Sequence, residues 1–205
     1  MCFAERGVLW CSGSQPSQSV IDAVLDEGVP VFGVDAGADR AVESGIEVEE
    51  VLGDLDSVDL ARWDRGLHEL PDQSSSDLAK SISLLIERGF AEIDVVGIEG
   101  GDTGHVLGSW AALCEAPGGA RIRLHHEDAV THRLHPQDGG LDLKIGEGRE
   151  FSVFALQPCK AWISGAKWEI EGEEISFSTR GLHNEGIGET VSIRSDGLLV
   201  AISPR

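Results

Sequence analysis

Two aspartates separated by one residue, Asp54 and Asp56, are the strongest candidates for chemistry in this sequence. They directly follow a strand predicted at residues 48–52. On extended backbone the two side chains point the same way, and carboxylates so close repel each other unless a cation lies between them. Magnesium bound together with nucleotide phosphates would suit such a pair. The alternative is a solvated turn in which one aspartate caps a helix predicted over residues 60–67.

Two more aspartates are expected near this pair because of the predicted fold class. Up to about residue 135 the chain alternates β-rich runs with helical patterns, which indicates a parallel sheet with crossover helices. In such sheets ligands bind beyond the carboxyl ends of the strands. Polar segments fall at these ends at residues 35–38, 53–57, 72–77 and 100–104. Asp35 and Asp77 should therefore join Asp54 and Asp56, which favours a metal–nucleotide site over a capped turn.

The predicted elements place these segments and divide the chain in two. Strands are expected at 7–12, 29–34, 48–52, 68–71, 92–98, 121–125 and 129–134, and helices from Ser17 to Gly28, from about 40 to Gly45, and at 60–67, 77–88 and 107–114. Beyond residue 136 the pattern changes to short alternating runs separated by turns, at 151–156, 161–163, 167–170, 175–178, 190–194 and 198–202. We therefore predict an α/β protein, with an N-terminal parallel-sheet α/β domain at 1–138 and a small C-terminal all-β sandwich at 139–205.

Other residues leave two interpretations open from the sequence alone. Gly100 and Gly101 could let backbone amides approach a phosphate, or could form an ordinary left-handed turn. His105 follows them and could be a surface residue or a ligand contact. Trp168, in a predicted strand, could pack in the core or stack on a flat heterocycle. Asn184 is most simply a hairpin-turn residue.

The composition excludes several classes of partner. A formal net charge of −20 argues against nonspecific binding to nucleic acid or to anionic membranes. The longest apolar runs are too short to span a bilayer. The four cysteines are scattered without CxxC spacing, which suggests free thiols in a reducing compartment and a cytoplasmic location: Cys2, Cys11, Cys114 and Cys159.

Taken in order, six segments resemble the thiamine pyrophosphokinase family over nearly the whole chain. They are Asp35-Ala36-Gly37-Ala38-Asp39-Arg40, Gly53-Asp54-Leu55-Asp56-Ser57, Asp72-Gln73-Ser74-Ser75-Ser76-Asp77-Leu78-Ala79-Lys80, Gly100-Gly101-Asp102-Thr103-Gly104-His105, Gly165-Ala166-Lys167-Trp168 and His183-Asn184-Glu185. The resemblance implies transfer of pyrophosphate from ATP to the hydroxyethyl oxygen of thiamine, giving thiamine diphosphate and AMP. It also implies a Mg²⁺ cofactor, ATP as co-substrate, and a homodimer in which thiamine binds between one subunit's α/β domain and the other's β-domain.

The resemblance further implies a role for each matching residue, with Asp54, Asp56 and Asp77 as the catalytic residues. Mg²⁺ or the polyphosphate would be held by Asp35, Asp54, Asp56 and Asp77. The nucleotide would lie near Gln73, Lys80, Gly100, Gly101 and His105, and thiamine near Trp168, His183 and Asn184.

One loop departs from the family pattern. Asp102 and Gly104 stand where the family has arginine and aspartate in GG-R-x-DH. An arginine there would neutralise phosphate charge, whereas an aspartate repels it. Such a loop is expected to reduce the activity. Two alternatives to a thiamine kinase stay open, and the altered loop favours the second. One is a pyrophosphokinase for a pterin-like alcohol, and the other is a thiamine or nucleotide sensor without catalysis.

Overall fold

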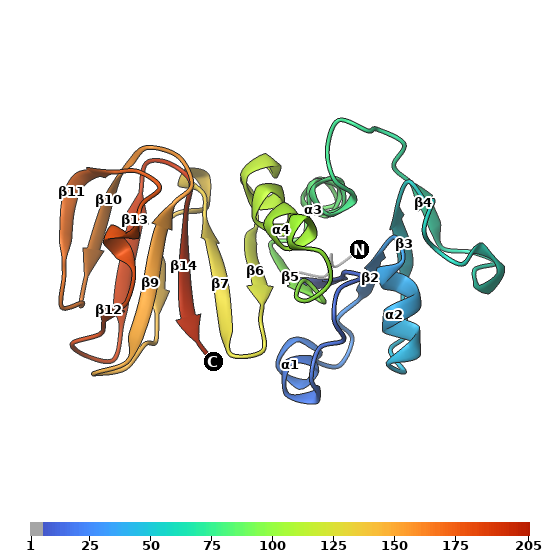
Figure 1. Cartoon of the computed structure of the whole chain (residues 1–205), viewed down its shortest axis with the longest axis horizontal. Coiled ribbons are helices and arrows are strands. Elements are labelled where there is room, and N and C mark those ends of the chain that lie inside the picture. The colour runs from blue at the N-terminus through green and yellow to red at the C-terminus, as the bar shows by residue number, and fades with distance from the viewer. Residues whose placement is uncertain (1–5) are drawn as a thin grey trace. The chain divides into compact units, whose positions relative to one another are not determined.

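The computed structural model describes residues 6–205, which form two compact units (Figure 1). The first ends at Glu127 and the second spans Asp128–Arg205. This division lies earlier in the chain than the boundary predicted after residue 138. The physical reason is strand β7 (Ala129–Leu134), which pairs antiparallel with the C-terminal strand β14 (Leu199–Pro204) and so belongs to the second unit.

A parallel sheet forms the centre of the first unit, as predicted. Its strands are β1 (Arg6–Trp10), β2 (Val31–Val34), β3 (Glu50–Gly53), β4 (Leu67–Glu69), β5 (Glu92–Val96) and β6 (Arg121–His125). Within this unit their order is β6-β5-β1-β2-β3-β4, and every neighbouring pair is parallel. The chain order therefore reverses at β1, which has β2 on one side and β5 on the other.

Four helices cover the two faces of this sheet. They are α1 (Gln18–Val24), α2 (Gly37–Glu43), α3 (Asp77–Glu87) and α4 (Thr103–Glu115). The first two pack on one face and the last two on the other (Figure 1). Helix α3 buries Leu78, Ile82 and Leu85, the stripe expected from its sequence, and Ser76 caps its first turn by accepting a hydrogen bond from the Ala79 amide. None of the described helices is both long and apolar enough to cross a membrane.

The helix predicted at 60–67 is wrong. Only one 3₁₀ turn, η1 (Leu60–Arg62), forms there, and β4 begins at Leu67. One contact and one backbone conformation accompany the early end of this turn. The indole of Trp63 donates to Asp39 Oδ1 at 3.0 Å, and Gly66 takes a left-handed conformation with φ of 75°.

The second unit is a sandwich of two antiparallel sheets, as predicted. One has the order β12-β9-β14-β7 and the other β11-β10-β13-β8 within this unit. The remaining strands are β8 (Leu141–Leu143), β9 (Glu150–Ala155), β10 (Cys159–Ser164), β11 (Ile170–Ile175), β12 (Asn184–Glu185) and β13 (Val191–Ser195), with 3₁₀ turns η2 (Pro136–Asp138) and η3 (Thr179–Gly181). Inward-facing Phe151, Val153, Ile163 and Ile193 form part of the shared core.

Three local predictions for this unit differ from the structure. Trp168 was expected in a strand but lies in the turn before β11, where 57% of the residue is exposed. Asn184 was expected in a hairpin turn but is a buried residue of β12. The run at 175–178 does not form a strand beyond Ile175, which ends β11.

Candidate active site

A cleft of about 460 Å³ lies at the carboxyl edge of the parallel sheet. Its walls come from the segments that follow β1, β2, β3 and β5 and from the first turns of α3 and α4: Cys11–Gly13, Val34–Ala36, Asp54, Asp56, Ser57, Ser76–Leu78, Gly97, Ile98, Gly100, Gly101, Gly104, His105, Gly108 and Ser109. This is the position at which open α/β sheets bind ligands. Burial raises the pKa of the Cys11 thiol to about 12, so that thiol is protonated and not nucleophilic at neutral pH.

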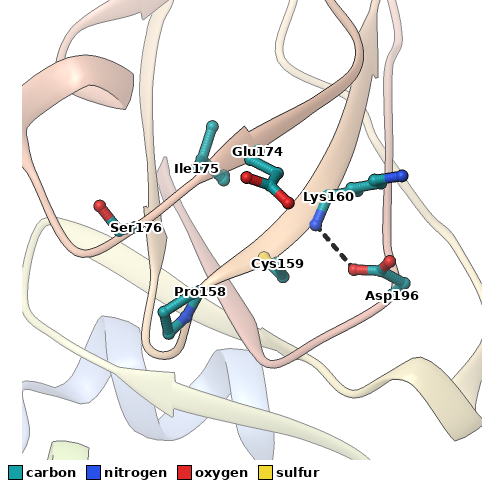
Figure 2. A pocket seen from close by; sticks show the side chains of 7 residues that line it. All are labelled: Pro158, Cys159, Lys160, Glu174, Ile175, Ser176 and Asp196. Carbon is teal, nitrogen blue, oxygen red and sulfur yellow. Dashed lines mark hydrogen bonds between the residues drawn. The ribbon is translucent and has the colours of Figure 1, made fainter.

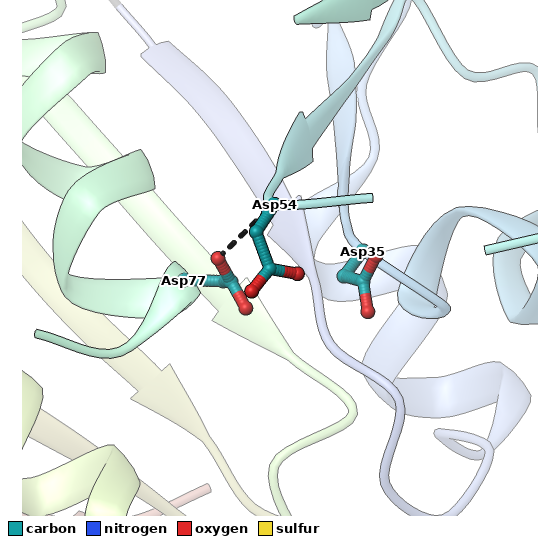
Figure 3. Close-up of side chains that lie close together, drawn as sticks. All are labelled: Asp35, Asp54 and Asp77. Atoms are coloured by element: carbon teal, nitrogen blue, oxygen red, sulfur yellow. Dashed lines mark hydrogen bonds between the residues drawn. The ribbon is translucent and has the colours of Figure 1, made fainter. Parts of the chain in front are cut away.

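Three of the four predicted aspartates converge in this cleft. Asp35 follows β2, Asp54 follows β3, and Asp77 is the first residue of α3. Each offers one carboxylate oxygen to a group whose atoms all lie within 4.8 Å of one another. Figure 3 shows the three side chains entering one small space from three different elements. Three hard oxygen ligands at this separation suit a divalent cation such as Mg²⁺.

Asp35 has a buried carboxylate oxygen that a bound cation would stabilise. Its Oδ1 is buried and has no hydrogen-bond partner among residues 6–205. Burial raises the pKa of the Asp35 carboxyl, hydrogen bonds from Ser57 and Ala36 lower it in part, and the charge of Asp77 raises it further. A positive ion beside Oδ1 would supply the missing partner and offset the repulsion, so the residues present fit the metal that the family resemblance implies.

Lys80 and Gln73 hold the other two aspartates in place. The Lys80 ammonium donates to Asp77 Oδ1 at 2.8 Å and to the carbonyl oxygens of Leu70 and Asp72 at 2.7 and 2.8 Å. Gln73 Nε2 donates to Asp54 Oδ2 at 2.8 Å, and this bond is the main reason that the pKa of Asp54 lies below its ordinary value. Both residues therefore brace the aspartates through the loop between β4 and α3.

Asp56 lies in the same cleft but outside the three-aspartate group. The expectation that Asp54 and Asp56 share one side of an extended segment is wrong, because Leu55 takes a left-handed conformation with φ of 65° and turns the chain. The Asp56 carboxylate accepts a hydrogen bond from the Ser57 hydroxyl at 2.6 Å. Its metal role stays a prediction.

Gly100 and Gly101 also line the cleft and form a left-handed turn, with φ of 74° and 71°. Any side chain at Gly100 would collide with the Ser14 hydroxyl, since an added Cβ would lie 1.9 Å from Ser14 Oγ. Within residues 6–205 neither glycine amide donates to a protein acceptor, so both amides are available to an anion.

Asp102 has a structural role that the sequence interpretation missed. It is the N-cap of α4, and its Oδ1 accepts a hydrogen bond from the Gly104 amide at 2.7 Å. Aspartate is one of the residues preferred at a helix N-cap, so Asp102 just before the predicted helix was a signal present in the sequence. His105 lies in the first turn of α4 and lines the cleft.

The predicted thiamine contacts form a separate group in the second unit. Asn184 accepts from the Trp168 amide at 3.2 Å and donates to the Trp168 carbonyl at 2.8 Å, which holds the turn that carries the indole. The Lys167 ammonium lies 4.9 Å from the centre of the Trp168 ring. His183 is exposed, and its Nδ1 lies 3.3 Å from Glu150 Oε2. An exposed, braced indole can stack on a flat heterocycle.

The second unit also contains a hollow of about 470 Å³ that includes none of the predicted site residues (Figure 2). In its lining the Lys160 amide donates a hydrogen bond to Asp196 Oδ1 at 2.7 Å, and the Asp196 amide donates to the Lys160 carbonyl at 3.1 Å. The residues around it are Pro158, Cys159, Lys160, Glu174, Ile175, Ser176 and Asp196.

Asp94 is a buried charged residue that the sequence interpretation placed in an apolar strand. Arg6 Nε and Arg123 Nε each lie 2.6 Å from its carboxylate oxygens, as does His125 Nε2. Burial alone would raise the pKa of Asp94, but the hydrogen bonds and charges of His125 and Arg123 hold it below its ordinary value. This network joins β1, β5 and β6 below the cleft and is structural. Arg6 and Arg123, on the two neighbouring strands, were the sequence features that could have indicated a buried ion-pair network.

Together these features define an α/β protein with an acidic, magnesium-suited cleft and an attached β-sandwich. The family model for the thiamin pyrophosphokinase catalytic domain matches residues 22–124. The chain therefore belongs to the thiamin pyrophosphokinase family, and this family supports an enzyme of the pyrophosphoryl-transfer type.

Several solved structures share this fold. Thiamine pyrophosphokinase from Bacillus subtilis is 21% identical with a TM-score of 0.78, covering 97% of this chain and 98% of that one. A protein from Lactobacillus plantarum is 23% identical with a TM-score of 0.77, covering 98% and 99%. Thiamin pyrophosphokinase from Candida albicans is 13% identical with a TM-score of 0.75, covering 100% and 91%. A search of curated protein sequences gives no match.

Proposed function

We propose that this chain transfers a pyrophosphoryl group from ATP to the hydroxyl of thiamine, giving thiamine diphosphate and AMP. The observation that carries the proposal is the convergence of Asp35, Asp54 and Asp77 around an unpartnered carboxylate oxygen. Across the same cleft, the free amides of Gly100 and Gly101 offer a place for phosphate oxygens.

In the proposed reaction the hydroxyl oxygen of thiamine bonds to the β-phosphorus of ATP and the hydroxyl proton is released to solvent. The bond from that phosphorus to the α–β bridging oxygen breaks, and AMP leaves with that oxygen. Mg²⁺ bound with the substrate would neutralise the charge that develops on the transferred group. The chain contributes the carboxylates of Asp35, Asp54 and Asp77 as metal ligands. Gln73 and Lys80 keep two of them in position, and Asp56 reaches the cleft from the adjoining turn.

Thiamine recognition is assigned to the second unit in the same proposal. The exposed indole of Trp168 offers a flat apolar surface to a heterocycle. The Lys167 ammonium lies over one face of the ring, so the heterocycle would stack on the other face. Both polar atoms of the Asn184 side chain bond within the protein, so Asn184 supports thiamine by holding Trp168. His183, at a left-handed position, is the third proposed contact.

The proposal includes a cytoplasmic homodimer. Among residues 6–205, Cys11, Cys114 and Cys159 form no disulfide, which agrees with a reducing compartment, and Cys2 lies outside the described residues. The homodimer is supported by the family resemblance.

Product analysis tests the proposal directly. Purified protein is incubated with ATP, Mg²⁺ and thiamine, and AMP and thiamine diphosphate are quantified. We expect equal amounts of both, and none when Mg²⁺ is chelated. Formation of AMP only with a pterin-like alcohol would refute thiamine as the acceptor. Thermal stabilisation by thiamine with no AMP would refute catalysis and identify a sensor.

A further inference from the structure

Two loops meet at the point where the strand order of the parallel sheet reverses. One follows β1 and the other follows β5, and these strands are neighbours. The Gly13 amide donates to the Gly97 carbonyl at 2.8 Å, and the Ser14 amide donates to the Glu99 carbonyl at 2.6 Å. Such a reversal point forms the crevice in which open α/β sheets bind their ligands.

The side chain of Glu99 connects this pair of loops to a third segment, after β6. Its Oε1 lies 3.3 Å from His126 Nδ1, and its Oε2 accepts a hydrogen bond from the Glu127 amide at 3.0 Å. The His126 ring stacks on Trp110 of α4, with centroids 6.2 Å apart and 28° between the planes. Glu127 Oε1 in turn accepts a hydrogen bond from the Ser17 amide at 2.9 Å. The segment after β6 therefore bonds both to the loop after β5 and to the loop after β1.

Glu99 does not line the cleft, whereas its neighbours Ile98, Gly100 and Gly101 do. Its side chain therefore acts on the loop from behind. Gly97, Gly100 and Gly101 all have left-handed φ, and glycine loses more conformational entropy on ordering than any other residue. A loop with three such residues needs an external anchor to present its amides in one orientation.

We propose that Glu99 is a positioning residue, which fixes the turn at Gly100 and Gly101 so that its amides face the polyphosphate of bound ATP. The ligand in this statement rests on the proposed function. The anchoring itself concerns the protein without ligand.

The sign of the effect on nucleotide affinity separates positioning from plain electrostatics. Glu99 is negative and close to the proposed phosphate site, so removing its charge alone should strengthen binding of an anion. Removing a positioning residue should weaken it. Glu99→Ala loses the contacts with His126 and with the Glu127 amide, whereas Glu99→Gln keeps an oxygen that can accept from the Glu127 amide. Glu115→Ala is the matched control, because it removes one negative charge at the C-terminal end of α4.

Amide hydrogen exchange in the ligand-free protein tests the anchoring. The reporters are the Gly13 and Ser14 amides, whose acceptors are backbone carbonyls that remain in every variant. We expect Glu99→Ala to speed their exchange about tenfold, which corresponds to about 1.4 kcal/mol. Glu99→Gln should change it by less than about threefold, and Glu115→Ala not at all. Unchanged exchange in Glu99→Ala would overturn the inference, and so would equal acceleration in Glu115→Ala.

Nucleotide binding and kinetics test the consequence. We expect Glu99→Ala to weaken binding of Mg²⁺–ATP about tenfold and to raise its KM with a smaller change in kcat, with recovery in Glu99→Gln. Tighter binding in Glu99→Ala would overturn the positioning role. Faster exchange together with no turnover in the wild type would refute only the proposed function, because the exchange measurement needs no substrate.

Discussion

Replacing Asp35 with asparagine should stabilise the ligand-free protein and abolish its response to Mg²⁺–ATP. Asp35 places a carboxylate oxygen in a buried position, next to Asp54 and Asp77, where no group of residues 6–205 bonds to it. An asparagine fills the same volume, can still accept the hydrogen bond from Ser57, and removes one of three like charges. The two effects have opposite signs, which makes the substitution informative.

The magnitudes follow from the burial. A buried polar group without a partner costs about 1–3 kcal/mol, so Asp35→Asn should raise the free energy of unfolding by about 1 kcal/mol. For a chain of this size that corresponds to an increase in Tm of about 2–4 °C. Wild-type protein should gain about 2.7 kcal/mol from Mg²⁺–ATP at a hundredfold excess over its Kd, and the variant should gain almost nothing. The order of the two melting temperatures should therefore invert when Mg²⁺–ATP is added.

Differential scanning calorimetry measures the melting temperatures of both proteins without ligand, with Mg²⁺–ATP at this hundredfold excess over Kd, and with ATP in the absence of Mg²⁺. Asp64→Asn, at an exposed position outside the cleft, is the matched control for the loss of one charge and should follow the wild type. A variant that melts below the wild type without ligand would refute the assignment of Asp35 as a strained, unpartnered carboxylate. Equal stabilisation of both proteins by Mg²⁺–ATP would refute its role as a metal ligand.

Three further predictions concern other parts of the chain. Asp94→Asn should destabilise the first unit by about 3–5 kcal/mol in chemical denaturation, since it leaves its buried cationic partners without a counter-charge. Because the pKa of Asp94 is lowered in the folded protein, its contribution to stability is present above the unfolded pKa of about 3.9. That contribution is lost as the pH falls through the lower folded pKa. Asp102→Asn should keep the helix cap and tighten Mg²⁺–ATP binding in calorimetric titration, whereas Asp102→Ala should cost about 1 kcal/mol of stability; weaker binding in the asparagine variant would contradict a repulsive role. Trp168→Ala should weaken thiamine binding roughly five- to tenfold in calorimetric titration without changing ATP binding. Phe177→Ala, which removes another exposed aromatic ring, is the control and should alter neither affinity.

The order of the elements and the edge of the sheet that carries the site were predictable from the sequence. Apolar runs of strand length alternate with helical stripes, and a polar segment follows each strand, so topology alone directs Asp35, Asp54 and Asp77 toward one edge. The β-sandwich was predictable for a similar reason, since its short alternating runs leave one face of each strand apolar.

Local backbone conformation was not predictable in the same way. The left-handed residue Leu55 separates Asp56 from Asp54, and no pattern in the sequence demands that conformation of a leucine. The helix expected at 60–67 fails because Trp63 bonds to Asp39, a partner distant in sequence. Asp94 gains its role from residues on neighbouring strands, and Glu99 gains its role from the segment after β6; periodicity within one segment shows neither.

The most direct test of pyrophosphoryl transfer uses ATP labelled at a chosen phosphorus. With the label on the β-phosphorus, thiamine and Mg²⁺, we predict that all transferred label appears in thiamine diphosphate and that the AMP is unlabelled. With the label on the α-phosphorus, we predict the reverse. Label from the β-phosphorus retained in ADP, or no labelled thiamine product in the presence of Mg²⁺, would contradict the proposed reaction.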